Sequence, residues 1–202
     1  MPMAWHPQTP LARVGLLHQD RRSIPAESLD GRSSILVPGT ETDAPTDFAF
    51  AVGDWRVTHR RLRERLLGCT EWIEFAGEMS TRPVLGGFGN IEDNLLHLPE
   101  GSYRAIALRS FEPRSQQWAI WWLDARAPHQ IDVPVVGSFK NGVGTFYADD
   151  SLDGAPIRIR FNWFTSDPDN PKWEQAFSTD GGTTWETNWT MDFRRAAPQP
   201  QA

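Results

Sequence analysis

The chain is poor in cysteine, in tyrosine and in long apolar runs, and each shortage excludes something. A single cysteine, Cys69, rules out an intrachain disulfide and a thiolate metal cluster within one chain. No apolar run approaches the ~18–20 residues of a membrane-spanning helix, and the N-terminus lacks the basic-then-apolar pattern of a secretory signal. We therefore expect a cytoplasmic protein without a membrane partner.

Basic residues are also fewer than acidic ones. The 202 residues carry 20 Lys and Arg against 26 Asp and Glu, which gives a formal net charge of −6 at pH 7. This balance disfavours nucleic acid as a main partner. The 2 tyrosines stand against 10 tryptophans. Because Trp buries a large area and brings one N–H that needs a partner, the excess favours a barrel core or an aromatic-lined cavity.

Composition divides the chain into three parts. Residues 1–46 are broken by prolines and polar tracts, so we expect an irregular, partly disordered N-terminal arm whose short apolar pieces can still dock on the domain. Residues 47–195 alternate apolar and polar residues in short runs and are expected to form one domain. Residues 196–202 are rich in Pro and Gln and are expected to form a flexible tail.

Within the domain, turn residues separate the short runs, and no stretch has the pattern of a long amphipathic helix. Asn141–Gly142 and Asp153–Gly154 suit tight hairpins, because both positions tolerate a positive φ. The glycine-rich run Leu85–Asn90 and the run Ser178–Trp185, which matches an Asp-box, are likewise expected to form turns. We expect strands at 54–63, 69–79, 91–97, 102–111, 117–124, 133–139, 143–149, 156–164, 172–178 and 185–194.

A meander of about eight to ten antiparallel strands with one apolar face closes most naturally into an up-and-down barrel. A two-sheet sandwich is the alternative, but it needs long crossovers for which the sequence offers few candidates. We therefore predict an all-β fold, an antiparallel meander closed into a calycin-like barrel of about eight to ten strands. At its base, Thr46–Asp47 can cap one helical turn whose Phe48 and Phe50 plug the opening.

Side chains alternate between the two faces of a strand, so the strand ranges predict which residues face inward. Strand 118–123 is unusual, because it is apolar on both faces and needs cover outside the barrel as well as within. The N-terminal arm or a second subunit can supply this cover, and we predict a homodimer through this strand. In 185–194, one face expected to line the interior carries Trp185, Thr187, Trp189, Met191 and Phe193.

The first strand, 54–63, has an apolar lower half and a polar upper half on one face. Trp55 is followed there by His59 and Arg61. A His in an apolar cavity can act as an acid, a base or a hydrogen-bond donor near neutral pH, and Arg61 can bind a carboxylate or enolate. The alternative is a His hydrogen-bonded to a neighbouring strand. The carboxylates that can orient His59 are Glu71, Glu74, Asp93 and Asp124.

With Gly53–Asp54–Trp55 on the first strand and Arg194–Arg195 at the end of the last one, the chain resembles the calycin superfamily, which includes the lipocalins. The resemblance implies that the Gly-x-Trp lies at the barrel base and that Arg194 or Arg195 packs on the Trp ring. The run from Phe48 to Arg194 also resembles a large bacterial domain-of-unknown-function family placed among the calycins. That family implies a barrel and no established reaction.

The nitrobindin-like haem proteins, another calycin group, also start with a Gly-x-Trp strand and hold haem by a His in the C-terminal part of the barrel. Here no His follows His129, so the position that would hold haem is missing. The spacing of the His, Asp and Glu residues does not form a metal set either. We expect neither a cofactor nor a metal.

The leading interpretation is a barrel that binds a small, largely apolar or aromatic molecule in its cavity, without a cofactor. The alternative is a cofactor-free enzyme (an isomerase, cyclase or hydrolase) with His59 as catalytic acid or base. A second alternative is a structural or interaction module. The predicted ligand-binding residues are His59, Arg61, Tyr103, Arg109, Phe161, Trp163, Trp173, Gln175, Trp189 and Met191. The residues predicted to build the barrel base are Gly53, Trp55, Arg194 and Arg195.

Overall fold

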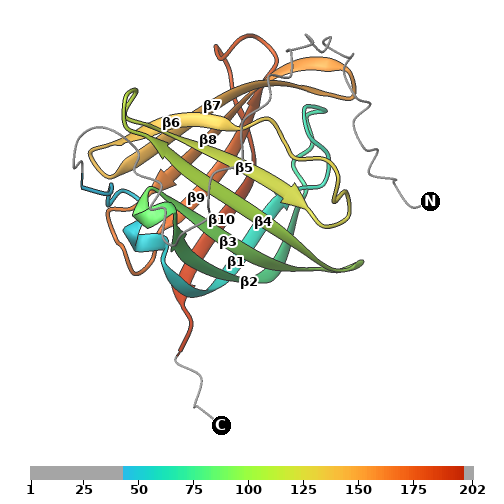
Figure 1. Ribbon diagram of the computed structural model, residues 1–202. Helices are drawn as coiled ribbons and strands as arrows, with labels where there is room; N and C mark the ends of the chain where they lie inside the picture. Colours follow the sequence, from blue (N-terminus) through green and yellow to red (C-terminus); the bar gives the residue numbers. More distant parts are fainter. Residues whose placement is uncertain (1–42, 198–202) are drawn as a thin grey trace, which may run out of the picture. The chain divides into compact units, whose positions relative to one another are not determined.

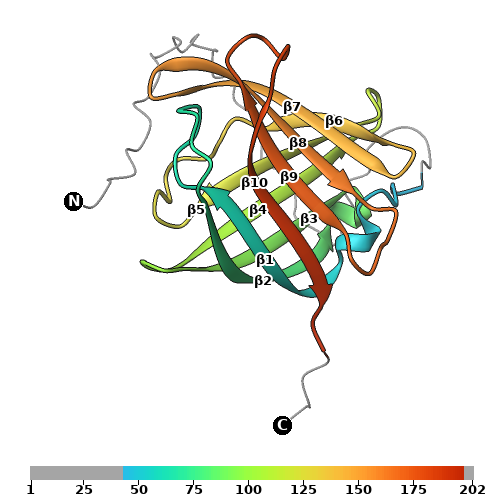
Figure 2. The ribbon, with the colours of Figure 1, turned by 180° about the vertical axis from the view of Figure 1, so that it is seen from behind.

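The computed structural model describes residues 43–197 and shows ten antiparallel strands closed into a barrel (Figure 1 and Figure 2). Each strand pairs with its neighbours in sequence, and β1 pairs with β10 to close the barrel, which confirms the predicted all-β meander. The barrel belongs to a compact unit that begins at Ala44. Expectations for residues 1–42 and 198–202 lie outside the described part. The strands are β1 (Gly53–Leu62), β2 (Trp72–Val84), β3 (Gly89–Leu98), β4 (Gly101–Glu112), β5 (Gln117–Asp124), β6 (Val135–Lys140), β7 (Val143–Leu152), β8 (Ala155–Phe164), β9 (Lys172–Ser178) and β10 (Glu186–Arg195).

The predicted turns link the strands as expected. Asn141 and Gly142 have φ of 52° and 77° between β6 and β7. Asp153 and Gly154 have φ of 51° and 80° between β7 and β8. The glycine-rich run forms the short turn η2 (Leu85–Gly87). The largest difference from the predicted ranges is in β2, which continues to Val84 because its alternation of buried and exposed side chains extends past residue 79.

One end of the barrel, called the base here, is closed from within by the turn η1 (Ala49–Ala51). Phe48, only 2% exposed, lies against the rings of Trp118, Phe139 and Phe146 at centroid distances of 5.0, 4.9 and 6.0 Å. The predicted side-chain cap on this turn is wrong. The carboxylate of Asp47 instead accepts a hydrogen bond from the indole of Trp118 at 3.0 Å, because that buried N–H needs a partner.

The Gly-x-Trp segment of β1 lies at the same end. The indole of Trp55 donates to the carbonyl of Ala51 at 2.9 Å, and Arg195 lies 3.9 Å over its ring. Gly53 has φ of 108°, and a Cβ there would lie 3.1 Å from the Arg195 guanidinium. Arg195 pairs in register with Trp55 and shares its face, whereas Arg194 pairs with Arg56 and is exposed on the other face. Arg195, and not Arg194, therefore covers the Trp ring.

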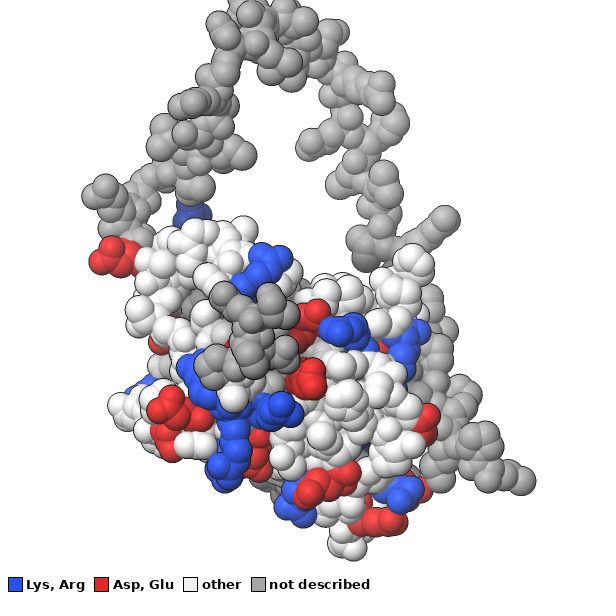
Figure 3. All heavy atoms as spheres, turned by 90° about the horizontal axis from the view of Figure 1, so that it is seen from below, with Lys and Arg blue, Asp and Glu red and all other residues white. Residues whose placement is uncertain are grey.

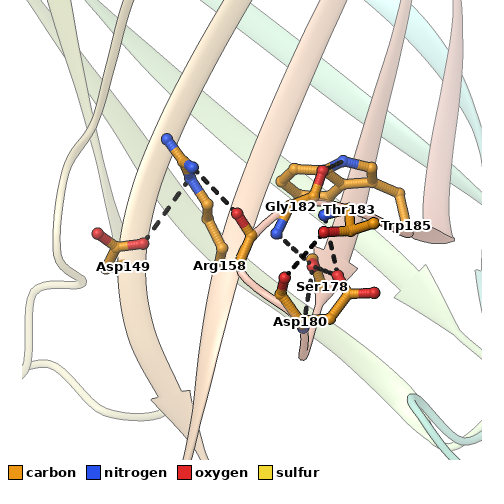
Figure 4. A network of polar contacts seen from close by, with 8 residues as sticks. Asp149, Arg158, Ser178, Asp180, Gly182, Thr183 and Trp185 are labelled. Atoms are coloured by element: carbon orange, nitrogen blue, oxygen red, sulfur yellow. Dashed lines mark hydrogen bonds and ion pairs between the residues drawn. The ribbon is translucent and has the colours of Figure 1, made fainter.

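The link between β9 and β10 is a hairpin braced by one carboxylate (Figure 4). Asp180 accepts from the N–H groups of Thr183 and Thr184 at 3.0 and 2.9 Å, and the hydroxyl of Ser178 donates to it at 2.7 Å. These hydrogen bonds, those of Thr184 first, hold the pKa of Asp180 well below its usual range. The indole of Trp185 donates to the carbonyl of Gly182 at 2.9 Å. The Asp-box sequence thus builds a hairpin turn, as expected.

A β-bulge in β10 corrects the predicted face assignment of its first residues. The register with β9 shifts between Thr187 and Trp189, and such an extra residue exchanges the faces on either side of it. Trp189 and the residues that alternate after it face the interior. Trp185 lies outside, where its ring contacts Tyr147 at 6.0 Å and Arg160 at 4.5 Å. The expectation that Trp185 and Thr187 line the interior is therefore wrong.

Strand β5 places apolar side chains on both faces, as its sequence indicates. Trp118 and Ile120 are buried inside, whereas Ala119, Trp121 and Leu123 lie on the outer face and are half-buried. An open hollow of about 250 Å³ lies on this part of the wall, lined among others by Phe111, Trp121 and Val136. The homodimer through this strand stays a prediction.

Charged side chains of both signs are interspersed on the face of the barrel seen in Figure 3. Acidic and basic groups lie side by side at several places on this face, with uncharged surface between these places. Exposed ion pairs of the barrel wall include those of Arg60 with Glu74, Arg63 with Glu71 and Arg104 with Asp93. Among the described residues, no helix has the length and apolar character needed to cross a membrane.

Candidate ligand site at the upper end of the barrel

Several inward-facing side chains toward the end of the barrel opposite the base, called the upper end here, are only partly buried. Phe161 of β8 pairs in register with Phe146 and Gln175, so it faces inward, yet it is only partly buried. Its in-register neighbour Phe146 is 0% exposed, and Trp163, two residues closer to the base on β8, is 3% exposed. An inward-facing side chain in a closed barrel reaches solvent only through an end. Because the base is plugged, the exposed part of Phe161 points to the upper end. Other inward side chains there that are partly exposed are Ile73, Trp122 and Ile159.

Aromatic rings line this upper half. Phe161 contacts Trp173 at 4.8 Å, Trp173 contacts Trp189 at 5.7 Å, and Trp189 contacts Trp122 at 6.2 Å between ring centroids. The first two edge-to-face contacts join the neighbouring strands β8, β9 and β10 into one wall, whereas Trp122 of β5 comes from the opposite side of the barrel and meets Trp189 across the interior. Met191, in register with Trp173, lies on the same inner face. The structure thus brings together the predicted apolar residues Phe161, Trp173, Trp189 and Met191. Trp163 pairs with Trp173 but packs its ring on the base residues Phe48, Phe50 and Phe193.

His59 lies within this wall and is 2% exposed. Its Nδ1 accepts a hydrogen bond from the indole of Trp189 at 3.2 Å, and its ring stacks on Phe75 at 4.7 Å. Its Nε2 lies above Gly77, where a Cβ would approach it to 2.4 Å. Burial first, and then the nearby charge of Arg61, lowers the pKa of His59 from 6.5 to about 3. The imidazole is therefore neutral at physiological pH.

The carboxylates that were expected to orient His59 all bind other groups. Glu71 and Glu74 form ion pairs with Arg63 and Arg60, at 2.8 and 4.0 Å. Asp93 pairs with Arg104 at 3.1 Å, and Asp124 pairs with Arg126 at 2.6 Å. The hypothesis that one of them orients His59 is wrong. The reason is that Glu71, Glu74 and Asp93 lie on the outer surface, and the inward Asp124 is held by an arginine of its own loop.

Arg61 and Tyr103 flank the upper opening. Arg61 is partly buried, with its guanidinium carbon 5.6 Å from the ring centroid of Phe75 and 5.5 Å from that of Trp189. Tyr103 is 9% exposed, and Arg126 lies 3.5 Å over its ring. Burial raises the pKa of Tyr103, against the opposing effect of the Arg126 and Arg61 guanidinium groups beside its hydroxyl.

Gln175 and Arg109, two other predicted polar residues, bind partners inside the barrel. Gln175 donates to the buried side chain of Asn188 at 2.8 Å. Arg109 is 2% exposed and forms an ion pair with Glu92 and a hydrogen bond with Asn90 at 2.9 Å. Arg109 also lies 4.8 and 5.4 Å over the rings of two base residues, Phe48 and Trp163. It therefore stabilises the base, away from the upper opening.

Sequence reasoning missed Arg65, which lies in the loop 63–71 between β1 and β2. Its guanidinium carbon is 5.9 Å from the ring centroid of Phe177, an inward residue of β9. The next residue, Leu66, has φ of 61° and donates its N–H to Glu186 at 2.8 Å. The loop thus bends back over the ends of β9 and β10. The alternation of apolar and polar residues indicates which way a side chain of β1 points, but it carries no such information for a residue in an irregular loop.

A metal centre has no ready ligand set in the part of the chain that the structure describes, where no group of three or more His, Cys, Asp or Glu side chains is placed to hold an ion. The upper end instead combines aromatic rings, a neutral imidazole and guanidinium groups. Such a surface can bind an apolar or aromatic body and orient it by a few polar contacts.

Comparison with known proteins supports the fold. The chain is similar to Rv2717c from M. tuberculosis, whose crystal structure superposes with a TM-score of 0.50 at 11% sequence identity. The match covers 77% of this chain and 100% of that one. At this identity the likeness shows a shared β-barrel architecture alone. No protein-family model matches the chain, and no curated protein matches it.

Proposed function

We propose that the protein binds a small, largely apolar or aromatic molecule in the upper half of the barrel, without a cofactor. The observation that carries this proposal is the partial exposure of inward-facing Phe161 and Trp122 in a barrel whose base is plugged by Phe48. Ordinary packing would bury such rings, since a fully buried aromatic side chain is stabilised by about 1.5–3 kcal/mol relative to an exposed one. A ligand that covers these rings gains a similar free energy of burial.

The resemblance of β1 and the last strand to calycins supports the same proposal. Gly53, Trp55 and Arg195 form the base arrangement that the resemblance implies. We therefore propose a calycin-type barrel that is closed at the base and binds its ligand from the other end.

Binding is favoured over the enzymatic alternative by the surroundings of His59. A general acid or base works best with a pKa near the operating pH, whereas the pKa of His59 is lowered to about 3. Its hydrogen-bond partner is the indole of Trp189 and not a carboxylate. In this arrangement His59 fixes the orientation of an aromatic wall residue.

A fluorescence titration with N-phenyl-1-naphthylamine, a neutral aromatic probe, tests the proposal. We expect saturable binding to the wild-type protein. Ala148 faces inward beside Ile159, so Ala148→Phe fills the lumen and is expected to weaken binding about tenfold or more, as overpacking removes the probe's space. Ser138→Phe places the same ring on the outer face of β6 and is expected to leave binding unchanged.

Circular dichroism and thermal unfolding establish that each variant folds. If Ala148→Phe does not fold, Ile159→Trp is used in its place, because it adds volume to the same part of the barrel interior. Absence of saturable binding to the wild-type protein, or equal affinity in the folded lumen-filling and outer-face variants, overturns the proposal.

A further inference from the structure

Two guanidinium groups, those of Arg61 and Arg65, lie at the upper opening of the lumen. Arg61 ends the inward face of β1 and lies over Phe75 and Trp189. Arg65 lies in the following loop, over Phe177. Trp189 pairs with Gln175, and Phe177 lies two residues further along the same inner face of β9, so the two guanidinium groups lie over neighbouring parts of one wall. Burial first, and then the charge of Arg61, lowers the pKa of Arg65 to about 10. The two groups therefore form one positively charged position beside the aromatic wall.

Among the residues that the structure describes, neither guanidinium has a carboxylate within ion-pair distance. In residues 43–197, the ion pairs within 4 Å involve other arginines and Lys172, and the exposed pairs of Arg60, Arg63 and Arg104 are examples. The carboxylate of Glu186 acts on Arg65 through its charge, but its hydrogen bond is with the backbone N–H of Leu66, which donates to it at 2.8 Å. The other described arginines without an ion pair are all exposed to solvent: Arg56, Arg82, Arg114, Arg194 and Arg195.

Arg61 and Arg65 differ from these arginines because they are partly buried. An exposed arginine needs no protein partner, because water solvates it. A partly buried one loses part of that solvation, and a second cation beside it adds repulsion. The chain has 26 Asp and Glu residues, yet the described part places none within ion-pair distance of either group. Two such cations are stabilised when an anion binds between them.

We propose that Arg61 and Arg65 form an anion site and that the molecule bound in the lumen is an amphipathic organic anion, with an aromatic or aliphatic body and one carboxylate or similar acidic group. The guanidinium fork matches the two oxygens of such a group. The body lies against Phe75 and Trp189 and extends toward Phe161. This inference rests on the proposed function and adds the charge of the ligand to it.

Two related probes separate the inference from the proposed function. 1-Anilinonaphthalene-8-sulfonate and N-phenyl-1-naphthylamine share one aromatic skeleton, and only the first carries an anionic group. We expect the wild-type protein to bind the sulfonate more tightly, with an affinity that falls as salt is added. If neither probe binds, the proposed function fails. If both bind with equal affinity, the barrel binds apolar molecules and the anion site is overturned.

Substitutions locate the site. In Arg61→Gln and in Arg65→Gln, the preference for the sulfonate over the neutral probe is expected to fall by about tenfold, as the loss of a charge-assisted hydrogen bond predicts. Arg63→Gln makes the same charge change in the same loop, at an exposed residue that is paired with Glu71 at 2.8 Å. It is expected to keep the wild-type preference. Equal loss in Arg63→Gln and Arg65→Gln overturns the proposal, because it indicates a general effect of net charge.

A competition experiment distinguishes an organic anion from free inorganic anions. 1-Naphthoate, which has an aromatic body and a carboxylate, is expected to displace the sulfonate probe at much lower concentration than inorganic phosphate does. Displacement by phosphate at the same or lower concentration contradicts the amphipathic ligand, because it shows that the charge alone is recognised.

Discussion

The indole N–H of Trp189 on β10 donates to Nδ1 of His59 on the adjacent strand β1, across 3.2 Å. The hydrogen bond requires Nδ1 to be an acceptor, so the proton of the neutral ring is assigned to Nε2. It satisfies the N–H of a buried indole and holds one ring of the aromatic wall in place. Both residues were expected to contact a ligand. Their mutual contact shows that His59 also positions Trp189.

His59 is expected to remain neutral at every pH at which the protein is folded. Its pKa is lowered from 6.5 to about 3, so the unfolded chain takes up a proton between these values that the folded chain does not. The free energy of unfolding is therefore unaffected by protonation of this histidine above pH 6.5, and it decreases as the pH falls from 6.5 toward 3. At pH 4.5 the loss is expected to be about 2–3 kcal/mol.

Urea unfolding at pH 7 and pH 4.5 measures this loss, with His59→Gln as the control. The variant has no imidazole to protonate, so its stability is expected to fall less than that of the wild-type protein over the same interval. In NMR spectra, the ring signals of His59 are expected to show no titration between pH 5 and pH 8. A midpoint near 6.5 would contradict the buried, neutral imidazole.

Gly77 is expected to be required for the position of His59. A Cβ at residue 77 would lie 2.4 Å from Nε2 of His59 and 3.1 Å from the carbonyl oxygen of Leu95. Gly77→Ala therefore displaces the imidazole, and we expect a destabilisation of about 1–3 kcal/mol, as for overpacking elsewhere.

A double-mutant cycle with His59→Ala tests the cause of that cost. With the imidazole removed, the added methyl group has space, so Gly77→Ala is expected to cost at least about 1 kcal/mol less in this background. Equal costs in both backgrounds, measured by urea unfolding, would assign the effect to the backbone near Leu95 and not to His59.

The strands and turns were predictable because their signals are local. Alternation of apolar and polar residues needs only a few neighbouring positions, and pairs such as Asn141–Gly142 have a conformational preference of their own. The bulge between Thr187 and Trp189 was not predictable in this way. One extra residue reverses the faces beyond it, and nothing in the alternation of 185–194 marks the position at which this happens.

The candidate site was predictable in part, for a related reason. Alternation gives the face of a strand residue, so Phe161, Trp173 and Arg61 were placed inward. It does not give the partner on another strand. Arg109 faces inward like Arg61, but Glu92 of β3 lies beside it and holds it near the base. Arg65 lies in a loop, where alternation gives no information.

Arg195 is expected to stabilise the base more than its neighbour Arg194 does. It lies 3.9 Å over the ring of Trp55 and donates to the carbonyls of Val52 and Phe50 at 2.6 and 2.9 Å. Arg195→Gln is expected to cost about 1–2 kcal/mol, from the lost cation–π contact and the weakened hydrogen bonds.

Arg194→Gln is the matched control for that substitution, because it makes the same chemical change one residue earlier on the exposed outer face. Its effect is expected to stay within about 0.5 kcal/mol, the range of ordinary surface substitutions. Equal effects of the two variants in urea unfolding would show that the contact of Arg195 with the Trp55 ring does not stabilise the base.

The buried pair of Glu92 and Arg109 gives a final prediction. The two side chains are 6% and 2% exposed, and Asn94 donates to the other carboxylate oxygen of Glu92 at 3.0 Å. Glu92→Leu leaves the guanidinium charged and buried with Asn90 as its hydrogen-bond partner, so it is expected to cost about 3–5 kcal/mol. Asp93→Asn changes the next residue, whose pair with Arg104 is exposed, and is expected to cost at most about 1 kcal/mol.

The double variant Glu92→Leu/Arg109→Met decides what the pair contributes. Apolar side chains of similar volume commonly replace a buried ion pair without loss, so the double variant is expected to be more stable than Glu92→Leu alone, as measured by urea unfolding. If the double variant is the less stable one, the aliphatic part of Arg109 and its contacts with Phe48 and Trp163 hold the base together, and the charge of Glu92 matters less than their packing.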